Sequence, residues 1–216
     1  AIGACVRHAA FHHPVVDGPL GRLLSTVVRH IAHYPIRTRG TFCGSLANAD
    51  PASEWCLVAA TLGAKIVAKS ARGTRTVAAQ DFFQGMMATA LEPDELLAEA
   101  RLPLLVPDTH VGFYEFNRRA GDFAIAMALA VYRIERGLIA DARIGVGGVE
   151  SHARRIAKAE AALNGHAPGK DVFQAAADAA ATAIDPIDNK PEAASYKRDV
   201  VCAAVRRALA AAEKSL

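Results

Sequence analysis

The stretch TFCGSLANADPASEW, residues 41–55, places small and polar residues between two apolar stretches. Gly44 has no side chain and would let the backbone come close to a flat or anionic group. Thr41, Ser45 and Asn48 carry short hydrogen-bond donors, and two acidic residues follow them. Judged by residue types alone, the stretch is either a loop that caps a helix or a loop that holds a ligand, and both interpretations remain open.

The segments on either side of this stretch read as short helices and strands. Apolar residues at helical spacing from Leu20 to Ile31 predict a helix whose start is marked by Gly18 and Pro19 and whose end is marked by Pro35. After the stretch, Asp50 or Ser53 can cap a short buried helix that ends at a turn on Gly63. The strands expected next are residues 65–69, a hairpin partner within 71–83, and an edge strand that ends at Pro103.

The second half of the chain changes from strands to helices. We expect a strand and turn over 110–121, a buried strand or helix over 122–137, and a strand over 138–150. Three helices should follow: residues 151–165 capped by Ser151, then 170–184, then 195–216 after a loop at 185–193. Strands followed by helices, without βαβ alternation, predict an α+β fold. The polar segment between Pro103 and His110 is the expected boundary, which divides the chain into residues 1–105 and 106–216.

Composition excludes several classes of protein. The formal net charge of +3 is too small and too scattered to predict nucleic-acid binding. No apolar run approaches the roughly 18 residues that a membrane span needs, and the N-terminal sequence lacks a signal peptide. The four cysteines have no metal-ligand spacing, so we expect free thiols and a cytoplasmic protein.

Three other motifs in the sequence give weaker signals. RIGVGGVESHARR has Glu150 where a dinucleotide-binding fingerprint needs glycine, so a tight turn is expected there. His8, His12 and His13 have no carboxylate or cysteine at ligand spacing and are expected at the surface, and no metal site is predicted. RRAGD, residues 118–122, is either a solvated turn with an internal ion pair or a turn that faces an anion or a partner.

A resemblance favours the ligand interpretation of the opening stretch. PIRTRGTFCGSLANADPASEW resembles the loop IRNRGTIGGSLAHADPAAD of the FAD-binding medium subunit of molybdenum hydroxylases, the xanthine dehydrogenase and carbon monoxide dehydrogenase flavoprotein family. The segments FFQGMMATALEPDELLAEARLP, FYEFNRRAGDFAIA, ARIGVGGVESHARRIAKAEAALNG and SYKRDVVCAAVRRAL resemble later motifs of that family, in the same order. The likeness therefore extends over almost the whole chain.

The resemblance implies a fold and a function. Residues 1–105 would be the second subdomain of a PCMH-type FAD-binding domain, and residues 106–216 a C-terminal domain of antiparallel sheet packed on helices. The chain would be the electron-transfer subunit of an oxidoreductase hetero-oligomer, passing electrons from [2Fe-2S] clusters on a small subunit through FAD to an external acceptor. Molybdopterin on a large subunit would oxidise the substrate, so no residue of this chain need be catalytic. The alternative is an assembly module that docks partner subunits without FAD.

The resemblance also implies cofactor-binding residues. Thr41, Phe42, Cys43, Gly44 and Ser45 would lie along the flavin and its phosphates, Asn48 and Ser53 would add hydrogen bonds, Glu54 would be an acidic flavin contact, Leu97 would pack on the ring system, and Tyr114 would approach the isoalloxazine.

The sequence departs from the family pattern at three places. Cys43 replaces a glycine, and Glu115 stands where the family motif YEKF has its lysine. Nothing in the printed sequence matches the family's first FAD-binding subdomain, so we expect the chain alone to retain little or no FAD. The apolar residues Ile2, Val6, Ile66 and Val67 are expected to lie partly exposed for the same reason.

Overall fold

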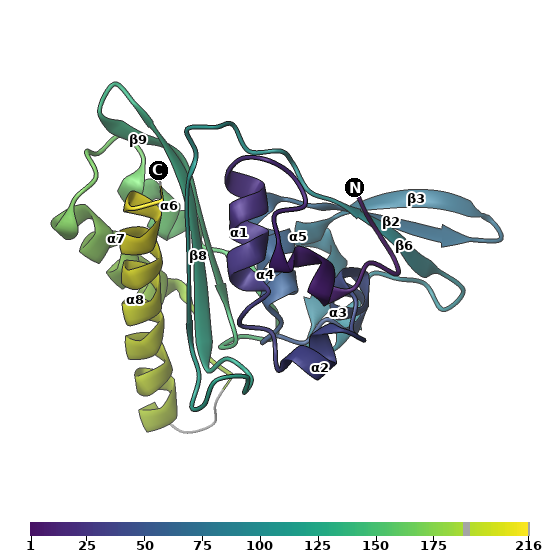
Figure 1. The fold of residues 1–216 in the computed structure, drawn as a ribbon. Helices are drawn as coiled ribbons and strands as arrows, with labels where there is room; N and C mark the ends of the chain where they lie inside the picture. Colours follow the sequence, from purple (N-terminus) through teal and green to yellow (C-terminus); the bar gives the residue numbers. More distant parts are fainter. Residues whose placement is uncertain (188–190, 216) are drawn as a thin grey trace.

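The computed structural model describes residues 1–187 and 191–215 and contains two four-stranded antiparallel sheets with helices around them. Figure 1 shows the first sheet at one end of the molecule and the second sheet between two layers of helices. The expected α+β class is therefore confirmed. The part of the expected loop at 185–193 that falls on residues 188–190 lies outside the described residues.

The first sheet has the strand order β1-β6-β2-β3, formed by β1 (Ile2–Gly3), β6 (Leu96–Arg101), β2 (Lys65–Ser70) and β3 (Gly73–Ala78). The prediction of an edge strand before Pro103 was wrong. Ile2 pairs with Ala100, so the N-terminal residues cover the free edge of β6 and make it a central strand. Ile2, Ile66 and Val67 are buried, which corrects the expectation that they lie partly exposed, whereas Val6 is partly exposed as expected.

The second sheet has the order β10-β9-β8-β7, formed by β10 (Arg154–Arg155), β9 (Leu138–Gly147), β8 (Ala126–Glu135) and β7 (His110–Phe116). The apolar segment that could have been strand or helix is a strand, β8. Ser151 does not cap a helix. The chain instead pairs Arg154 with Val146 and Arg155 with Gly145, and the helix begins only at Ala157.

The helices differ in length from the expected ones. The first ends at Val27 because the next residues turn more tightly, with the His30 N–H bonded to the Val27 carbonyl. The last begins at Pro191, before the expected start at Ser195. The remaining elements are η1 (His8–His12), α1 (Pro19–Val27), α2 (Tyr34–Arg37), α3 (Phe42–Asn48), α4 (Glu54–Leu62), α5 (Ala79–Phe82), β4 (Phe83–Gly85), β5 (Ala88–Thr89), α6 (Ala157–Leu163), α7 (Lys170–Ala183) and α8 (Pro191–Glu213).

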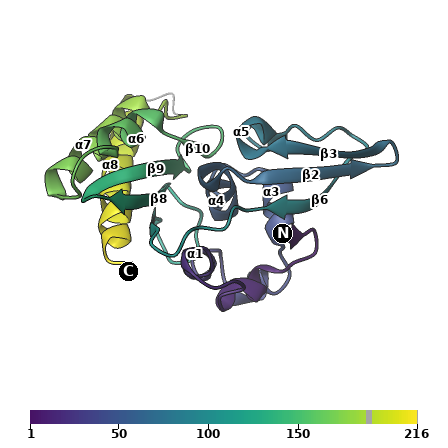
Figure 2. The same cartoon turned by 90° about the horizontal axis from the view of Figure 1, so that it is seen from above.

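Side chains of the second sheet contribute to two hydrophobic cores. Figure 2 shows β8 and β9 between α8 on one side and α1 and α4 on the other. On β7, Val111 and Phe113 belong to the core that contains α1 and α4, whereas Gly112 lies against α8. On β9, Gly145 lies so close to α4 that an added Cβ would overlap the Thr61 hydroxyl. The first core therefore contains residues from both halves of the chain.

Two further expectations concern the cysteines and membrane-spanning helices. All four cysteines are free thiols, as expected. Among the helices of the described residues, none combines the length and the apolar character that crossing a bilayer requires.

Candidate functional site

The opening stretch is built around a short helix, α3, where only a loop was expected. Thr41 is its N-cap, and the Thr41 hydroxyl accepts a hydrogen bond from the Gly44 N–H at 3.0 Å. Ala49 ends the helix in the left-handed conformation, with φ 51°. Ser53 is the N-cap residue of α4 but makes no side-chain capping bond. The stretch therefore caps a helix and still presents a polar edge.

Replacing Thr41 with alanine should remove one capping bond and lower the free energy of unfolding by about 1 kcal/mol. Urea unfolding measures this change. Thr41→Ser keeps the hydroxyl and is the matched control, which should stay near the wild type. Equal losses in both variants would show that the methyl group, not the capping bond, stabilises α3.

Buried aromatic side chains pack together beneath residues 41–55. Trp55 is fully buried, with ring centroids 5.1 Å from Phe11 and 4.9 Å from Phe42. The indole N–H donates to Nδ1 of His8 at 2.9 Å. Burial, and then the charge of Arg37, lower the pKa of His8 to about 4. His8 is therefore a neutral, buried acceptor, which corrects its prediction as a surface residue.

A cavity of about 260 Å³ lies above this cluster. Its walls come from α3, the start of α4, the segment 31–36, and the turn that follows β7. The residues that line it are His8, Ile31, Ala32, Ile36, Ser45, Asn48, Asp50, Ala52, Ser53, Glu54, Gly121, Asp122 and Phe123. The structure thus brings four of the predicted site residues, Ser45, Asn48, Ser53 and Glu54, around one space.

The RRAGD turn forms one wall of this cavity. Gly121 has φ 86°, and Asp122 and Phe123 follow it at the cavity wall. Phe123 is 76% exposed, which is unusual for a large apolar side chain. Within the described residues, no ion pair joins Asp122 to Arg118 or Arg119. The internal ion pair of the solvated-turn interpretation is therefore absent from the described residues, and the end of the turn lies at the cavity wall.

Two carboxyl groups have raised pKa values: the partly buried Glu54, which lines the cavity, and the buried Glu115 on β7. Burial, and then the charge of Asp50, raise the pKa of Glu54 to about 7. Burial, and then the charge of Glu54, raise the pKa of Glu115 to about 8. Asn117 donates to Oε1 of Glu115 at 3.0 Å, but Oε2 has no hydrogen-bond partner. Sequence reasoning noted Glu115 only as a departure from a motif. The signal that was missed is its spacing of two and four residues from Phe113 and Val111, which places it on the same face of β7.

The other predicted site residues do not line the cavity. Phe42 and Cys43 point into the core, where the Cys43 thiol contacts the Ile2 carbonyl oxygen at 3.4 Å and burial raises its pKa to about 11. Leu97 is buried in β6. Tyr114 packs on the opposite side of β7, under the guanidinium of Arg207. Thr41 and Gly44 lie at the start of α3, next to Ser45.

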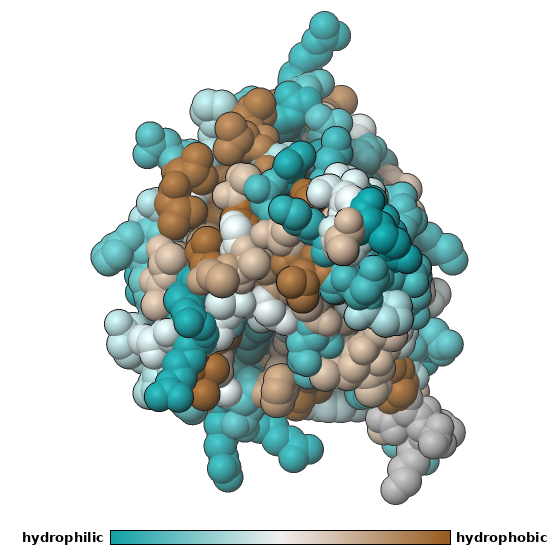
Figure 3. Space-filling model, turned by 90° about the vertical axis from the view of Figure 1, so that its right-hand side faces the viewer, coloured by the Kyte–Doolittle hydropathy of each residue, from teal (hydrophilic) through white to brown (hydrophobic). Residues whose placement is uncertain are grey.

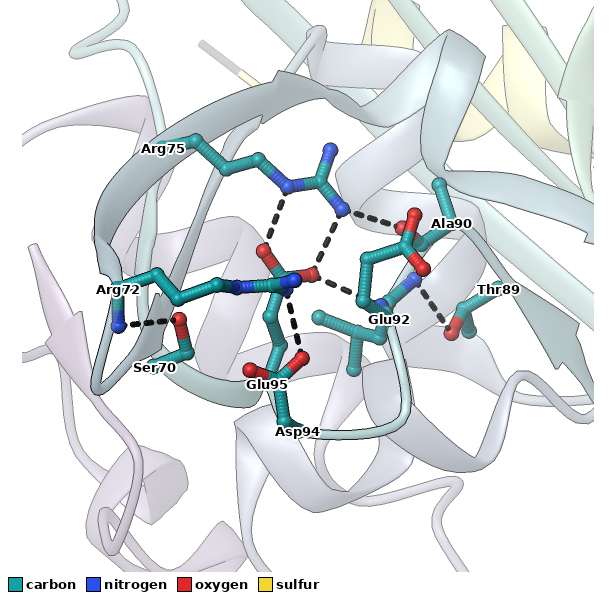
Figure 4. A network of polar contacts seen from close by, with 9 residues as sticks. Ser70, Arg72, Arg75, Thr89, Ala90, Glu92, Asp94 and Glu95 are labelled. Carbon is teal, nitrogen blue, oxygen red and sulfur yellow. Dashed lines mark hydrogen bonds and ion pairs between the residues drawn. The ribbon is translucent and has the colours of Figure 1, made fainter.

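An ionic network fixes the turn that leads into Leu97 (Figure 4). Arg75 on β3 donates to both carboxylate oxygens of Glu95, at 2.6 and 2.7 Å, and to the Ala90 carbonyl oxygen at 2.6 Å. Glu95 in turn accepts from the Glu92 N–H at 2.8 Å. The bonds from Arg75 lower the pKa of Glu95 to about 2. The network holds the turn against the β2–β3 hairpin and so positions the start of β6.

Large apolar side chains are exposed near the candidate site. Met86 and Met87 lie at the turn between β4 and β5, Leu96 begins β6, and Tyr34 and Ile36 are in α2. Asn48 contacts the Met87 sulfur at 3.9 Å. Figure 3 shows the end of the molecule that carries the first sheet, where apolar groups lie among charged ones.

Comparison with known proteins places this geometry in a family. Residues 1–105 match the model "FAD binding domain in molybdopterin dehydrogenase", and residues 112–212 match "CO dehydrogenase flavoprotein C-terminal domain". The chain is 36% identical over 208 residues to the nicotine 6-hydroxylase medium subunit of Paenarthrobacter nicotinovorans, covering 96% of this chain and 72% of that protein.

Solved structures agree with the sequence matches. A carbon monoxide dehydrogenase from Hydrogenophaga pseudoflava, in a form that lacks the Mo-pyranopterin moiety of the molybdenum cofactor, superposes with a TM-score of 0.89 at 34% identity, covering 96% of this chain and 72% of that one. Quinoline 2-oxidoreductase from Pseudomonas putida 86 gives a TM-score of 0.87 at 33% identity, covering 98% and 74%.

The fold and these matches define a flavoprotein component of an oxidoreductase. The chain belongs to the family of FAD-binding medium subunits of the molybdenum hydroxylases. The alternative, an assembly module without FAD, is not favoured, because the matching domain is an FAD-binding domain.

Proposed function

We propose that α3 and the cavity beside it hold part of FAD, and that the chain carries electrons from a small [2Fe-2S] subunit to an external acceptor in a cytoplasmic complex. A large molybdopterin subunit oxidises the substrate of that complex. Bound FAD supplies the redox chemistry, and this chain's residues bind and orient it and exclude water. The observation that carries the proposal is the convergence of Ser45, Asn48, Ser53 and Glu54 on one cavity within a matched FAD-binding domain.

The residues around the cavity fit one part of FAD. Ser45, Asn48 and Ser53 offer hydrogen-bond donors, and Ile31 and Phe123 offer apolar surface for a ring. The volume of about 260 Å³ is below the roughly 300–1,000 Å³ of a typical small-molecule site. The cavity therefore takes one portion of the dinucleotide, and the remainder lies along α3, next to Thr41 and Gly44.

The proposal assigns residues 1–105 to FAD binding and residues 106–216 to a C-terminal domain. Gly121, Asp122 and Phe123 then line the site from the second of these. Neither Leu97 nor Tyr114 lines the cavity, so their proposed contacts with the flavin lie outside it.

Gly44→Val tests the proposed site. A Cβ at position 44 would lie 2.6 Å from the Thr41 hydroxyl oxygen, and the rest of the valine would fill the open edge of α3. We expect the dissociation constant for FAD to rise at least about tenfold, which is about 1.4 kcal/mol of binding free energy. Titration with FAD of the chain supplied with the family's first FAD-binding subdomain, followed by flavin fluorescence, measures the change.

Two controls separate the possible causes. Thr41→Ala loses the capping bond and the Thr41 hydroxyl without filling the edge, so it measures how much of the lost affinity comes from those two groups. Gly169→Val adds the same side chain where nothing lies within 4 Å, and it should bind FAD like the wild type. Full FAD affinity in Gly44→Val would show that the edge of α3 is not the site.

A further inference from the structure

Glu115 is a buried acid without the partners that an ionised carboxylate needs. Its side chain is 0% exposed, and Oε2 accepts no hydrogen bond. The nearest cationic candidate is Nδ1 of His30 at 3.8 Å, which is longer than a hydrogen bond. Burial lowers the pKa of His30 while burial raises that of Glu115, so both shifts favour a neutral pair of side chains and not an ion pair.

Glu54 links this buried acid to the cavity. Glu54 lines the cavity, and its charge is the second cause, after burial, of the raised pKa of Glu115. The two carboxyl groups belong to different halves of the chain, Glu54 to α4 and Glu115 to β7. Like charges brought together in a poorly solvated place do not both ionise at neutral pH, so their titrations are coupled.

Few groups around the two carboxyls could supply a positive charge to pair with an ionised carboxylate. Facing the pair or the cavity are His30 after α1, His8 of η1 with Arg37 behind it, Asp50 before α4, and Asp122 in the turn after β7. Arg207 lies on the other face of β7, against Tyr114. Asp50 further raises the pKa of Glu54, and no arginine or lysine lines the cavity among the described residues.

We propose that Glu54, at the cavity wall, and the buried, unpaired Glu115 form a coupled carboxyl pair that takes up a proton when the cavity is filled, so that the chain binds FAD more weakly as the pH rises. The second part rests on the proposed function. A ring that enters the cavity removes water from Glu54, and loss of water favours the uncharged carboxyl. Binding is then linked to proton uptake, and linkage makes the affinity depend on pH.

The protein without ligand tests the pair itself. Carbon-13 NMR of labelled glutamate carboxyls should show two groups that titrate near neutrality, far above the ordinary value of about 4.3. Glu115→Gln should remove one of them. Glu54→Gln should remove the other and lower the midpoint of Glu115, since a repelling charge is gone. An ordinary midpoint for Glu115, or one that Glu54→Gln does not move, would overturn the pair.

Stability provides a second readout on the same protein. The pKa of Glu115 rises from 4.5 to about 8 in the folded chain, so its neutral form stabilises the fold fully below 4.5 and this contribution is lost as the pH rises to about 8. The midpoint of urea unfolding should therefore fall over that range in the wild type and fall less in Glu115→Gln. Identical pH profiles would contradict the proposal.

FAD binding tests the linkage. Between about pH 7 and about pH 9, the dissociation constant of the wild type should rise about tenfold, and that of Glu54→Gln should stay nearly constant. Asp141→Asn makes the same chemical change on an exposed residue of β9 with φ 51°, a conformation that asparagine tolerates, and should keep the wild-type dependence. A pH-independent wild type overturns the linkage alone. These titrations use the chain supplied with the family's first FAD-binding subdomain, and absence of FAD binding there at every pH overturns the proposed function, and the linkage with it.

Discussion

Replacing Trp55 with alanine should lower the free energy of unfolding by about 3–5 kcal/mol, which is the usual cost of deleting a fully buried large aromatic side chain. Trp55 contacts Phe11 and Phe42 and donates its indole N–H to His8. Its loss leaves a hole in the core and an unpaired buried nitrogen directly beneath the cavity. Urea unfolding gives the free energy, and FAD titration should show weakened binding in the fraction that stays folded.

Trp55→Phe separates packing from hydrogen bonding. Phenylalanine keeps a ring between Phe11 and Phe42 but leaves Nδ1 of His8 without its donor, which costs about 1–3 kcal/mol. We expect this variant to lie between the wild type and Trp55→Ala. If Trp55→Ala is as stable as the wild type, the aromatic cluster does not support the site.

Replacing Gly112 with valine should destabilise the chain by about 3 kcal/mol or more. A Cβ at this position would overlap the Ala208 carbonyl oxygen and the Ala212 nitrogen, and would lie 2.9 Å from the Ala212 Cα. These are backbone atoms of α8, so no side-chain rotation can relieve the overlap. Either α8 moves away from β7 or the strand shifts in the sheet.

Hydrogen exchange identifies which of these occurs. Loss of protection in α8 with an intact sheet would show that the helix has moved, and it should accompany loss of the contact between His110 Nδ1 and the Ala212 carbonyl, now 3.0 Å. Gly169→Val is the matched control, because a side chain there meets open space. Wild-type stability in Gly112→Val would mean that β7 and α8 do not pack this closely in solution.

Local signals in the sequence predicted much of the fold. The helix α4 and the strand β2 were found because an apolar run ends at Gly63, which takes φ 68° as a helix C-cap. The strand β6 was predicted in the right part of the sequence, but its place at the edge of the sheet was wrong because the strand beside it, at Ile2, is remote in sequence. The helix after β9 was placed too early because Arg154 and Arg155 form strand pairs, a tertiary effect that a capping pattern does not contain.

The candidate site was predicted only where its residues are contiguous. Ser45, Asn48, Ser53 and Glu54 lie within one stretch, and the family resemblance marked them as cofactor contacts. The participation of Phe123 and the coupling of Glu54 to Glu115 depend on how the two halves of the chain meet. The spacing of residues in the sequence does not show which residues of the two halves come into contact, so these features could be found only in the structure.

The fit of Gly145 against α4 restricts how this chain can diverge. Because an added Cβ would overlap the Thr61 hydroxyl and lie 2.8 Å from a Leu57 methyl, a larger residue on β9 is tolerated only if α4 changes in compensation. The same helix begins at Glu54, so such a compensation is transmitted to the cavity wall. Exchange of one half of the chain for that of a relative should therefore weaken ligand binding even when every cavity residue is retained. Substitutions at the contact between β9 and α4 are expected to occur together in the two halves.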